Sequence, residues 1–279
     1  MAIGGSLGLV DGSISVRNWT ISESSSVPET WHSSSLGMVT NFNGNKDWTG
    51  GYSQYFEEPT NWPGDEISFV GSMEDALGVG GDCIIDSINI VWDVAGCRPV
   101  VIDTAFSGNG ALSRADTTDV TDGAQTATPS AGCYITIMEA LTGEAYAEIP
   151  GIQNITFNIS CSNQAYASSA TSGIIKRLKG NWNANLAIGL VIDRSCQDIN
   201  DLPVINSLYK VKIIQADASY WDIQAIRFSG VTNVTVDVEQ PNVVTGTLNG
   251  MFTGTWWDTD DCVNGVIVPP SLSQWWPEE

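Results

Sequence analysis

The chain has 279 residues, 42% of them hydrophobic and 9% aromatic, which is enough to bury a substantial core in one or two domains. Its 32 acidic and 11 basic residues give a formal net charge of −21, which excludes a protein that wraps nucleic acid through clustered Lys and Arg. The charge could serve solubility alone, or it could form a surface past which DNA slides without sticking.

The composition favours an all-β protein. Charged residues make up only 15% of the chain, whereas Ser, Thr, Asn and Gly are abundant. Straight-chain helix formers such as Glu and Lys are scarce, and the abundant residues are typical of strands and turns. We therefore expect an all-β fold.

The amino terminus, 1–5, has neither a basic region nor an apolar run, and no window approaches the roughly 20 apolar residues of a membrane span. We expect neither a signal peptide nor a membrane segment. The cysteines are widely scattered and none has CxxC spacing, so we expect reduced, partly buried thiols and no zinc site. They are Cys83, Cys97, Cys133, Cys161, Cys196 and Cys262.

Alternating or short apolar runs between turn residues predict strands along the whole chain. The clearest predicted strands, in chain order, are Ser13–Ile21, Ile84–Trp92, Gln153–Ile159, Lys210–Ile214 and Val231–Val238. The pairs Asp11-Gly12, Asn43-Gly44 and Pro63-Gly64 predict turns between strands.

Two segments predict short helices, one in each half of the chain. Ser72–Leu77 has Ser72 as a possible N-cap and Asp75 at the third helical position. Asn200–Leu208 is the weaker counterpart.

The sequence contains an internal repeat. At an offset of 136 (154 − 18), residues 18–45 lie on 154–181 without a gap and share eight identities in 28 positions. The offset then becomes 144 (237 − 93), which aligns Asn89, Asp93 and Val94 with Asn233, Asp237 and Val238. A chain rich in Ser, Gly and Asn can match itself by chance, but the repeated order of strands and loops favours duplication. The identities are Asn18/Asn154, Thr20/Thr156, Ser24/Ser160, Ser26/Ser162, Ser33/Ser169, Gly37/Gly173, Gly44/Gly180 and Asn45/Asn181.

The repeat predicts two domains, 1–125 and 132–268, followed by a tail, 269–279. Ser113–Gly132 has the composition of a loop and is expected to link them.

Residue patterns for catalysis are weak, so we do not expect an enzyme. His32 lies in a Ser-rich, loop-like segment with no sign of an activated nucleophile. Asp258, Asp260 and Asp261 could ligate Ca²⁺ but lack the Gly and Glu of a known loop. The acidic pairs Glu57-Glu58 and Glu74-Asp75 do not stand out among so many acids. We predict no catalytic, cofactor or metal site.

The chain has 11 tryptophans, which suit both cores and interfaces. Trp19 and Trp92 lie in predicted strands and are expected in the core. The tryptophans of predicted loops and of the tail are interface candidates: Trp31, Trp62, Trp275 and Trp276.

Three segments resemble the major tail tube proteins of tailed phages. They are 4–12 with the strand that leads into Trp19, the Gly-Asn-Lys-Asp-Trp block of 44–52, and 61–69, where a Pro-Gly-Asp turn joins two strands. The resemblance covers roughly 4–94, and extends to the second repeat only through the internal similarity. The second repeat departs from the pattern, since 181–184 differs and no Pro-Gly turn occurs there.

The resemblance implies two tandem β-sandwich or barrel domains, each with one short helix. Subunits of this family form stacked rings around a commonly acidic lumen, and a chain with two copies implies trimeric, pseudo-hexameric rings. It also implies a virion location, assembly in the host cytoplasm, and contacts with terminator, baseplate or tip, and tape-measure proteins, with DNA passing unbound. The long loops, Ser22–Leu36 and Ser160–Ser172, are implied to contact the next ring. Their candidate residues are Trp31, His32, Ser33, Tyr166 and Ser168.

Two other functions stay open. A tail-terminator, neck or head-decoration protein would use a related fold but would stop at one ring. A carbohydrate-binding or hydrolysing β-sandwich would line a groove with Trp and carboxylates.

Overall fold

The computed structural model describes residues 6–9, 12–27, 29–30, 40–41, 44–55, 59, 61–72, 77–116, 127–139, 147–171, 173–193, 203–216, 220–236 and 243–252. Within them the regular structure is β, apart from one 3₁₀ turn at Ser169–Thr171. The predicted all-β class is confirmed. The sheet faces are built from strands that alternate apolar and polar residues, as in Ile152–Cys161.

We call residues 6–116 the first half of the chain and residues 134–252 the second half. The first half contains β1 Ser6–Leu9, β2 Gly12–Ser15, β3 Asn18–Ser25, β4 Glu29–Thr30, β5 Thr40–Asn41, β6 Lys46–Tyr55, β7 Glu66–Ser72, β8 Leu77–Asp93, β9 Val101–Gly108 and β10 Ser113–Asp116. The second half contains β11 Tyr134–Glu139, β12 Ala147–Ile149, β13 Ile152–Cys161, β14 Gln164–Tyr166, β15 Lys176–Leu178, β16 Trp182–Asp193, β17 Leu208–Ile214, β18 Tyr220–Val236 and β19 Val243–Phe252.

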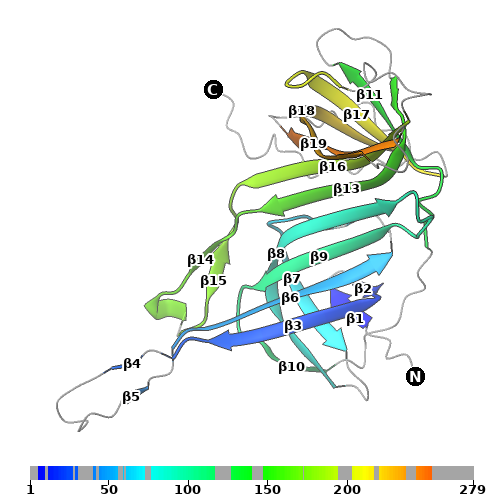
Figure 1. Cartoon of the computed structure of the whole chain (residues 1–279). Coiled ribbons are helices and arrows are strands. Elements are labelled where there is room, and N and C mark those ends of the chain that lie inside the picture. Colours follow the sequence, from blue (N-terminus) through cyan, green and yellow to red (C-terminus); the bar gives the residue numbers. More distant parts are fainter. Residues whose placement is uncertain are drawn as a thin grey trace, which may run out of the picture.

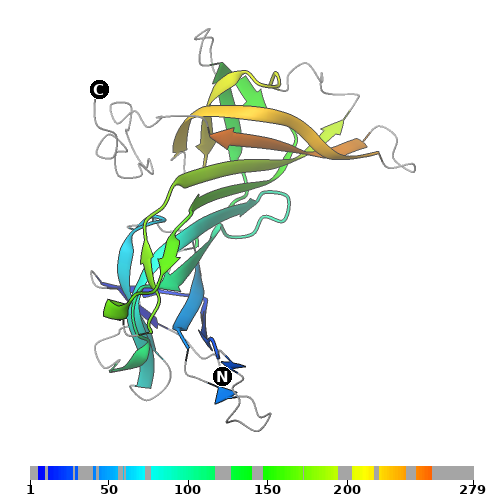
Figure 2. The same ribbon diagram turned by 90° about the vertical axis from the view of Figure 1, so that its left-hand side faces the viewer.

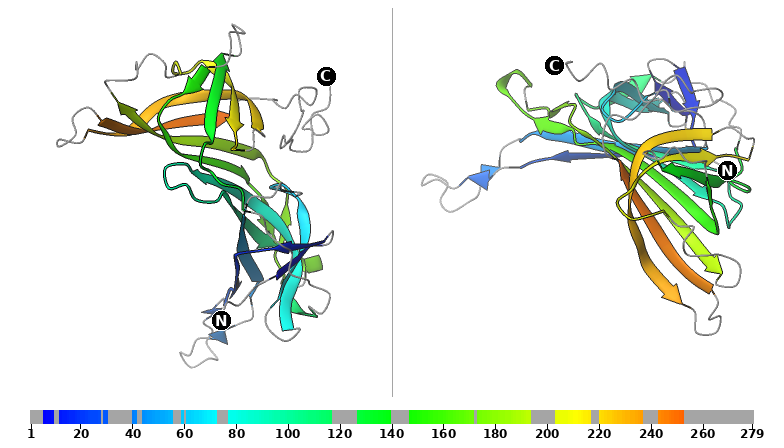
Figure 3. Two further views of the ribbon diagram at one scale, coloured as in Figure 1. Left: turned by 90° about the vertical axis from the view of Figure 1, so that its right-hand side faces the viewer. Right: turned by 90° about the horizontal axis from the view of Figure 1, so that it is seen from above.

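The same strand order occurs in both halves. Neighbouring strands run β2-β1-β7-β8-β9-β6-β3 in the first half and β12-β11-β17-β18-β19-β16-β13 in the second. Each half also carries a small two-stranded arm, β4-β5 or β14-β15. Pairing of β8 with β13 joins the halves into one sheet (Figure 1). Figures 2 and 3 show an elongated body that bends where the halves meet.

The strand register repeats at the offsets found in the sequence. Trp19 pairs with Tyr52 between β3 and β6, and Ile155 pairs with Ile188 between β13 and β16, 136 residues later. The β-bulge of β8 between Ile85 and Ser87 recurs in β18 between Phe228 and Gly230.

One part of the sequence alignment is shifted by a residue. Asn89 pairs with Asp103, and the corresponding pair in the second half is Thr232 with Thr247, so Thr232 and not Asn233 takes the place of Asn89. A second bulge in β18 follows Thr232 and restores the offset of 144.

Three of the identical pairs, Ser26/Ser162, Gly44/Gly180 and Asn45/Asn181, form the base of each arm. The Ser26 and Ser162 N–H groups donate to the carbonyls of Asn45 and Asn181, at 3.0 and 2.9 Å. A Cβ at Gly44 would lie 2.1 Å from the Ser26 carbonyl oxygen, and Gly180 is equally close to Ser162. Because only glycine permits this approach, the Ser, Gly and Asn identities have a structural reason.

The turn before β7 is matched by the turn before β17, although its Pro-Gly sequence is not. Gly64, with φ of +89°, donates its N–H to Ile85 O, and Asn206, with φ of +67°, donates to Phe228 O. Asn tolerates this left-handed conformation better than most residues. The turn therefore survives in the second half without its Pro-Gly pair.

One apolar core runs through both halves. Trp92 of the first half meets Trp221 of the second edge to face, with ring centroids 5.6 Å apart. Trp92 is buried and Trp19 packs against the core, as predicted. The interface role predicted for Trp62 is wrong, since its side chain is 5% exposed. Hydrogen bonds from Gly64 to Ile85 and from Ile85 to Asp65 fold its turn onto β8 and carry the indole into the core.

The two helix predictions are wrong for the described residues. Ser72 pairs with Gly78 near the closed end of the β7–β8 hairpin, so too little chain lies between them for a helix. In the second segment, residues 203–207 form a turn and Leu208 begins β17. The first segment lies between the paired strands β7 and β8, and the described part of the second leads into β17.

The loop predicted for Ser113–Gly132 is wrong at its start, where Ser113–Asp116 forms β10 against β8. The predicted Pro63-Gly64 turn is confirmed, while Asp11 and Asn43 lie outside the described residues. The four described cysteines form no disulfide, and burial raises the pKa of the Cys83 and Cys161 thiols. Such thiols are weak nucleophiles at neutral pH.

Tyr52 predicts an alkaline weakness of the fold. Burial raises the pKa of its hydroxyl from 10.0 to about 12, so the folded state holds a proton that the unfolded state loses above pH 10. The free energy of unfolding should fall by about 2–3 kcal/mol between pH 10 and 12 on account of this group. Tyr52→Phe should reduce that fall in urea denaturation, whereas Tyr134→Phe, at an exposed tyrosine, should not. If the free energy of unfolding of Tyr52→Phe fell as steeply between pH 10 and 12 as that of the unmodified chain, the assignment to Tyr52 would be wrong.

Candidate functional site

The most distinctive part of the structure is the pairing of β8 with β13, which we call the seam. It extends from Ser87↔Ser160 to Asp93↔Asn154. On one face the seam is apolar, with Trp92 beside Ile155 and both fully buried. Since β7 covers only the earlier part of the same edge of β8, the later part is free to accept β13.

The β14-β15 arm of the second half lies on the first half. Lys46 N–H donates to Gly173 O at 2.7 Å, and Ile175 N–H donates to Lys46 O at 3.0 Å. These bonds make an isolated parallel bridge between Lys46 and Ile174. The arm thereby crosses the seam and contacts the beginning of β6.

A buried ion pair holds this arm in place. Both terminal nitrogens of Arg177 reach the Asp47 carboxylate, Nη1 to Oδ1 at 2.8 Å and Nη2 to Oδ2 at 2.6 Å. Arg177 is 9% exposed and also donates to Gly108 O. Bidentate arginine–carboxylate pairs are strong and directional, so Arg177 fixes both the position and the angle of the arm.

Asn109 extends this network. It accepts the Arg177 N–H on Oδ1 at 2.6 Å, donates from Nδ2 to Glu66 at 2.7 Å, and offers its carbonyl to Lys176 Nζ. Asn109 is buried, so these partners meet the polar groups that burial would otherwise leave unsatisfied.

Two further polar contacts bind the second half to the first. Lys179 Nζ lies 3.5 Å from Asp65 Oδ1, and Asn163 Nδ2 donates to Asp86 Oδ1 at 2.8 Å. We call the three contacts Arg177–Asp47, Lys179–Asp65 and Asn163–Asp86 the latch. In each of them an acid of the first half meets a donor on or beside the β14-β15 arm.

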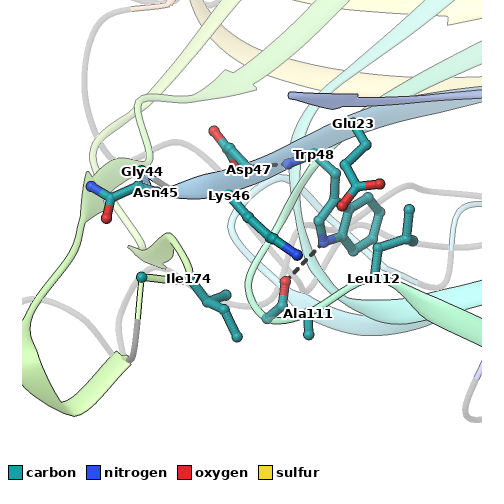
Figure 4. A pocket seen from close by; sticks show the side chains of 11 residues that line it. Glu23, Gly44, Asn45, Lys46, Asp47, Trp48, Ala111, Leu112 and Ile174 are labelled. Carbon is teal, nitrogen blue, oxygen red and sulfur yellow. Dashed lines mark hydrogen bonds between the residues drawn. The ribbon is translucent and has the colours of Figure 1, made fainter. Parts of the chain in front are cut away.

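A cavity of about 360 Å³, lined by both polar and apolar residues, lies beside the latch (Figure 4). Its ionisable lining residues are Glu23, Lys46 and Asp47, and Asp47 is already paired with Arg177. Trp48 closes one side and donates from Nε1 to Gly110 O at 2.9 Å. The described residues that line the cavity include no Ser, Thr, Cys or His.

The face of the sheet opposite the core is polar and nearly uncharged. Eight neighbouring strands, β3-β6-β9-β8-β13-β16-β19-β18, present mainly Ser, Thr, Asn, Gly and Ala there, together with a few apolar side chains such as Val91, Val101 and the exposed Met251. The exposed charged side chains on it, among the described residues, are Asp103 and Arg227. More than half of the 32 acidic residues lie in segments outside the described residues. The charge of −21 is therefore not concentrated on the described part of this face.

The two ends of this run of strands carry free edges in the described structure. β3 pairs with β6 on one edge only. β17 covers β18 only as far as Arg227, which leaves the same edge open from Ser229 to Val236.

Exposed apolar side chains gather in the second half near that open edge. Val236 is 47% exposed, while its counterpart Trp92 in the first half is 0% exposed. Val204, in the turn that matches 62–65, is 65% exposed, and its counterpart Trp62 is 5% exposed. In the first half, the seam and the β14-β15 arm cover Trp92 and Trp62. In the second half, the counterparts Val236 and Val204 stay uncovered within one chain.

The structure describes two of the five predicted loop residues. Tyr166 and Ser168 are exposed on the β14-β15 arm, and Ser168 shares hydrogen bonds with Thr171. The other three, Trp31, His32 and Ser33, lie outside the described residues. So do the candidate acids Glu57, Glu58, Glu74, Asp75, Asp258, Asp260 and Asp261 and the tail tryptophans Trp275 and Trp276.

The part of the chain that the structure describes holds no cluster of three metal-ligating side chains. In that same part, no helix has the length and apolar character needed to cross a membrane.

Sequence reasoning missed the latch, although the sequence carries a signal for it. Lys176, Arg177 and Lys179 stand within four positions and make up three of the 11 basic residues of a strongly acidic chain. The acidic partners of Arg177 and Lys179 lie 130 and 114 residues away along the chain and cannot be chosen from 32 acids without the fold.

Comparison with known proteins gives no family assignment: no protein-family model matches the chain, and no curated protein matches it significantly.

Removing Arg177 from its pair with Asp47 should destabilise the fold far more than removing an arginine from an exposed pair. Arg177→Met leaves the Asp47 carboxylate, 26% exposed, without its partner, and should lower the free energy of unfolding by about 2–3 kcal/mol. Arg98→Met is a matched control, because Arg98 pairs with Asp93 but is 78% exposed, and it should cost under about 1 kcal/mol. Urea denaturation measures both, and similar losses would show that the buried pair has no special role.

Proposed function

We propose that the chain is a structural protein that polymerises through its sheet edges into stacked rings, forming a tail tube of the tailed-phage type through which DNA passes. The seam is the observation that carries this proposal, because it joins the two halves by strand pairing. The strands β3 and β18, at the two ends of the eight-stranded run, leave the corresponding edges free. Under this proposal the two halves are tail-tube-like domains, 1–125 and 132–268, followed by the tail, 269–279.

Two chains can repeat the seam between them. β13 in the second half occupies the place of β3 in the first, and β18 occupies the place of β8. Pairing β18 of one copy with β3 of the next would therefore copy the β8–β13 contact, with Val236 opposite Trp19 of the neighbour. Such head-to-tail contacts propagate into closed rings or into filaments.

The exposed apolar residues support this pairing. Val204, Ile205 and Val236 are 65%, 56% and 47% exposed, at positions whose first-half counterparts the second half covers. Burying them against another copy would remove apolar surface from water and would also cover an open strand edge. The same surface on a monomer would favour aggregation, so a dedicated partner is the better explanation.

The resemblance to tail tube proteins supplies the ring size and the lumen. Hexameric rings of single-domain subunits correspond to trimeric rings of this chain. The polar face described above would then line the lumen. This face consists mainly of uncharged Ser, Thr and Asn side chains and carries few cations, so it offers DNA little electrostatic attraction. Neutrality of the wall, more than acidity, would let DNA slide past.

A sugar-binding function has less support. Among the described tryptophans, Trp48, Trp62, Trp92 and Trp221 are all buried, so they cannot form an exposed row for a glycan. A terminator, neck or decoration role uses the same edges, and the extent of assembly separates it from a tube.

Negative-stain electron microscopy of the purified chain across a concentration series tests the function. We expect hollow tubes with a regular repeat and threefold or near-sixfold end views. Single rings at every concentration would favour a terminator or neck protein, and monomers at every concentration would overturn assembly through free edges.

Val236→Asp should prevent ring formation without unfolding the chain, because Val236 is 47% exposed in the monomer and faces the next copy only after assembly. A buried, unpaired carboxylate would raise the concentration needed for assembly at least about tenfold. Tyr134→Asp adds the same charge at an exposed residue of β11, two strands from β18, and should assemble normally. Sedimentation velocity and circular dichroism measure assembly and folding, and equal assembly of the two variants would contradict the proposed edge.

A further inference from the structure

Among the described residues, the β4-β5 arm of the first half makes no docking contact comparable to that of its counterpart. Its strand pairs, Glu29↔Asn41 and Thr30↔Thr40, match Ala165↔Arg177 and Tyr166↔Lys176 of the second arm at the offset of 136. The second arm lies against the first half, whereas the first arm projects away from the body (Figure 1, and Figure 3, right). The two arms therefore have the same register but different surroundings.

The counterpart positions of the latch contain no charged residue. Asn41 stands where Arg177 is, and Asn183 stands where Asp47 is. The Lys179–Asp65 pair corresponds to an asparagine at position 43 and to Ser207. In the third contact, Val27 and Ser229 replace Asn163 and Asp86. Every charge of the latch is thus confined to the contact within one chain.

Building on the proposed function, we propose that the β4-β5 arm binds laterally to the second half of the preceding copy, in the place that the β14-β15 arm takes on the first half, through an uncharged contact. The occupant is a second copy of this chain, since a β18–β3 seam between copies brings the arm that follows β3 to that place. The exposed turn at 204–206 and Val27, which is 58% exposed, are both covered in this arrangement.

The charge difference gives each arm one correct docking place. The second arm carries Lys176, Arg177 and Lys179, whose partners Asp47 and Asp65 occur only on the first half. Placed on the neutral second half, Arg177 would be buried without a carboxylate, which is strongly unfavourable. The latch therefore rejects exchange of the arms and keeps first and second halves alternating around a ring.

This assignment differs from a purely inter-ring role for the two loops. The base of the second arm is bound within the plane of the seam, through Asn163 and Arg177. Its tip, with Tyr166 43% exposed, stays available for a contact with the next ring. Each arm would then have a lateral base and an axial tip.

Transplanting the ion pair to the contact between chains tests the proposal. In Asn41→Arg with Asn183→Asp, an arginine on the arm of one copy should meet an aspartate on the next. We expect half-maximal assembly at a concentration about tenfold below that of the unmodified chain, while each single variant shows no gain. The advantage should shrink as ionic strength rises, because salt screens the new pair. Light scattering and sedimentation velocity measure both effects.

The outcomes separate this inference from the proposed function. If the unmodified chain assembles but the double variant gains nothing over the single variants, the tube function stands and the lateral docking is wrong. If the unmodified chain never assembles, both fall. A rise in the thermal midpoint of the monomer would place the two residues in contact within one chain and would also overturn the proposal. Asn41→Lys with Asn183→Glu repeats the test with a different pair, should the first variant fold poorly.

Discussion

Strand β8 is paired along both of its edges over most of its length, and the rest of the structure depends on this arrangement. β10 and β9 follow one another along one edge, while β7 and β13 follow one another along the other. A strand as long as Leu77–Asp93 is needed to accept two partners on each side. Because the second partner on one edge comes from the other half, a single strand makes two similar halves into one sheet with one core.

The same arrangement explains why the second half looks unfinished. β18 is as long as β8 and repeats its bulge, yet the later part of its edge has no partner in the described chain. The exposed side chains of Val204, Ile205 and Val236 lie where the first half is covered. A monomer with these features has one used interface and one unused copy of it, which is the geometry expected of a subunit that propagates head to tail.

Charge is used unevenly in the molecule. The polar face of the eight-stranded run is built mainly from hydroxyl and amide side chains, while the clustered basic residues lie at the latch. An ion pair that is buried and bidentate has a large cost if its partner is lost, so it is better suited to specifying one arrangement than to adding stability. Here that property falls on the contact within the chain, which under the proposed assembly must be correct before any copy can join another.

The sequence by itself determined the all-β class, the repeat and its offset of 136, because strand alternation and the close packing of Gly44 and Gly180 leave local patterns. The offset of 144 needed the structure, since two bulges in β18 shift it by one residue around Thr232. The sequence wrongly predicted a helix at Ser72–Leu77. The pairing of Ser72 with Gly78 in a hairpin leaves too little chain for one, and only strand pairing imposes this constraint. Nor did the sequence place Trp62, whose loop-like neighbours fold onto β8 and bury it. The latch was decided by tertiary structure alone: Arg177 and Asp47 are 130 residues apart, and only the seam brings them within hydrogen-bonding distance.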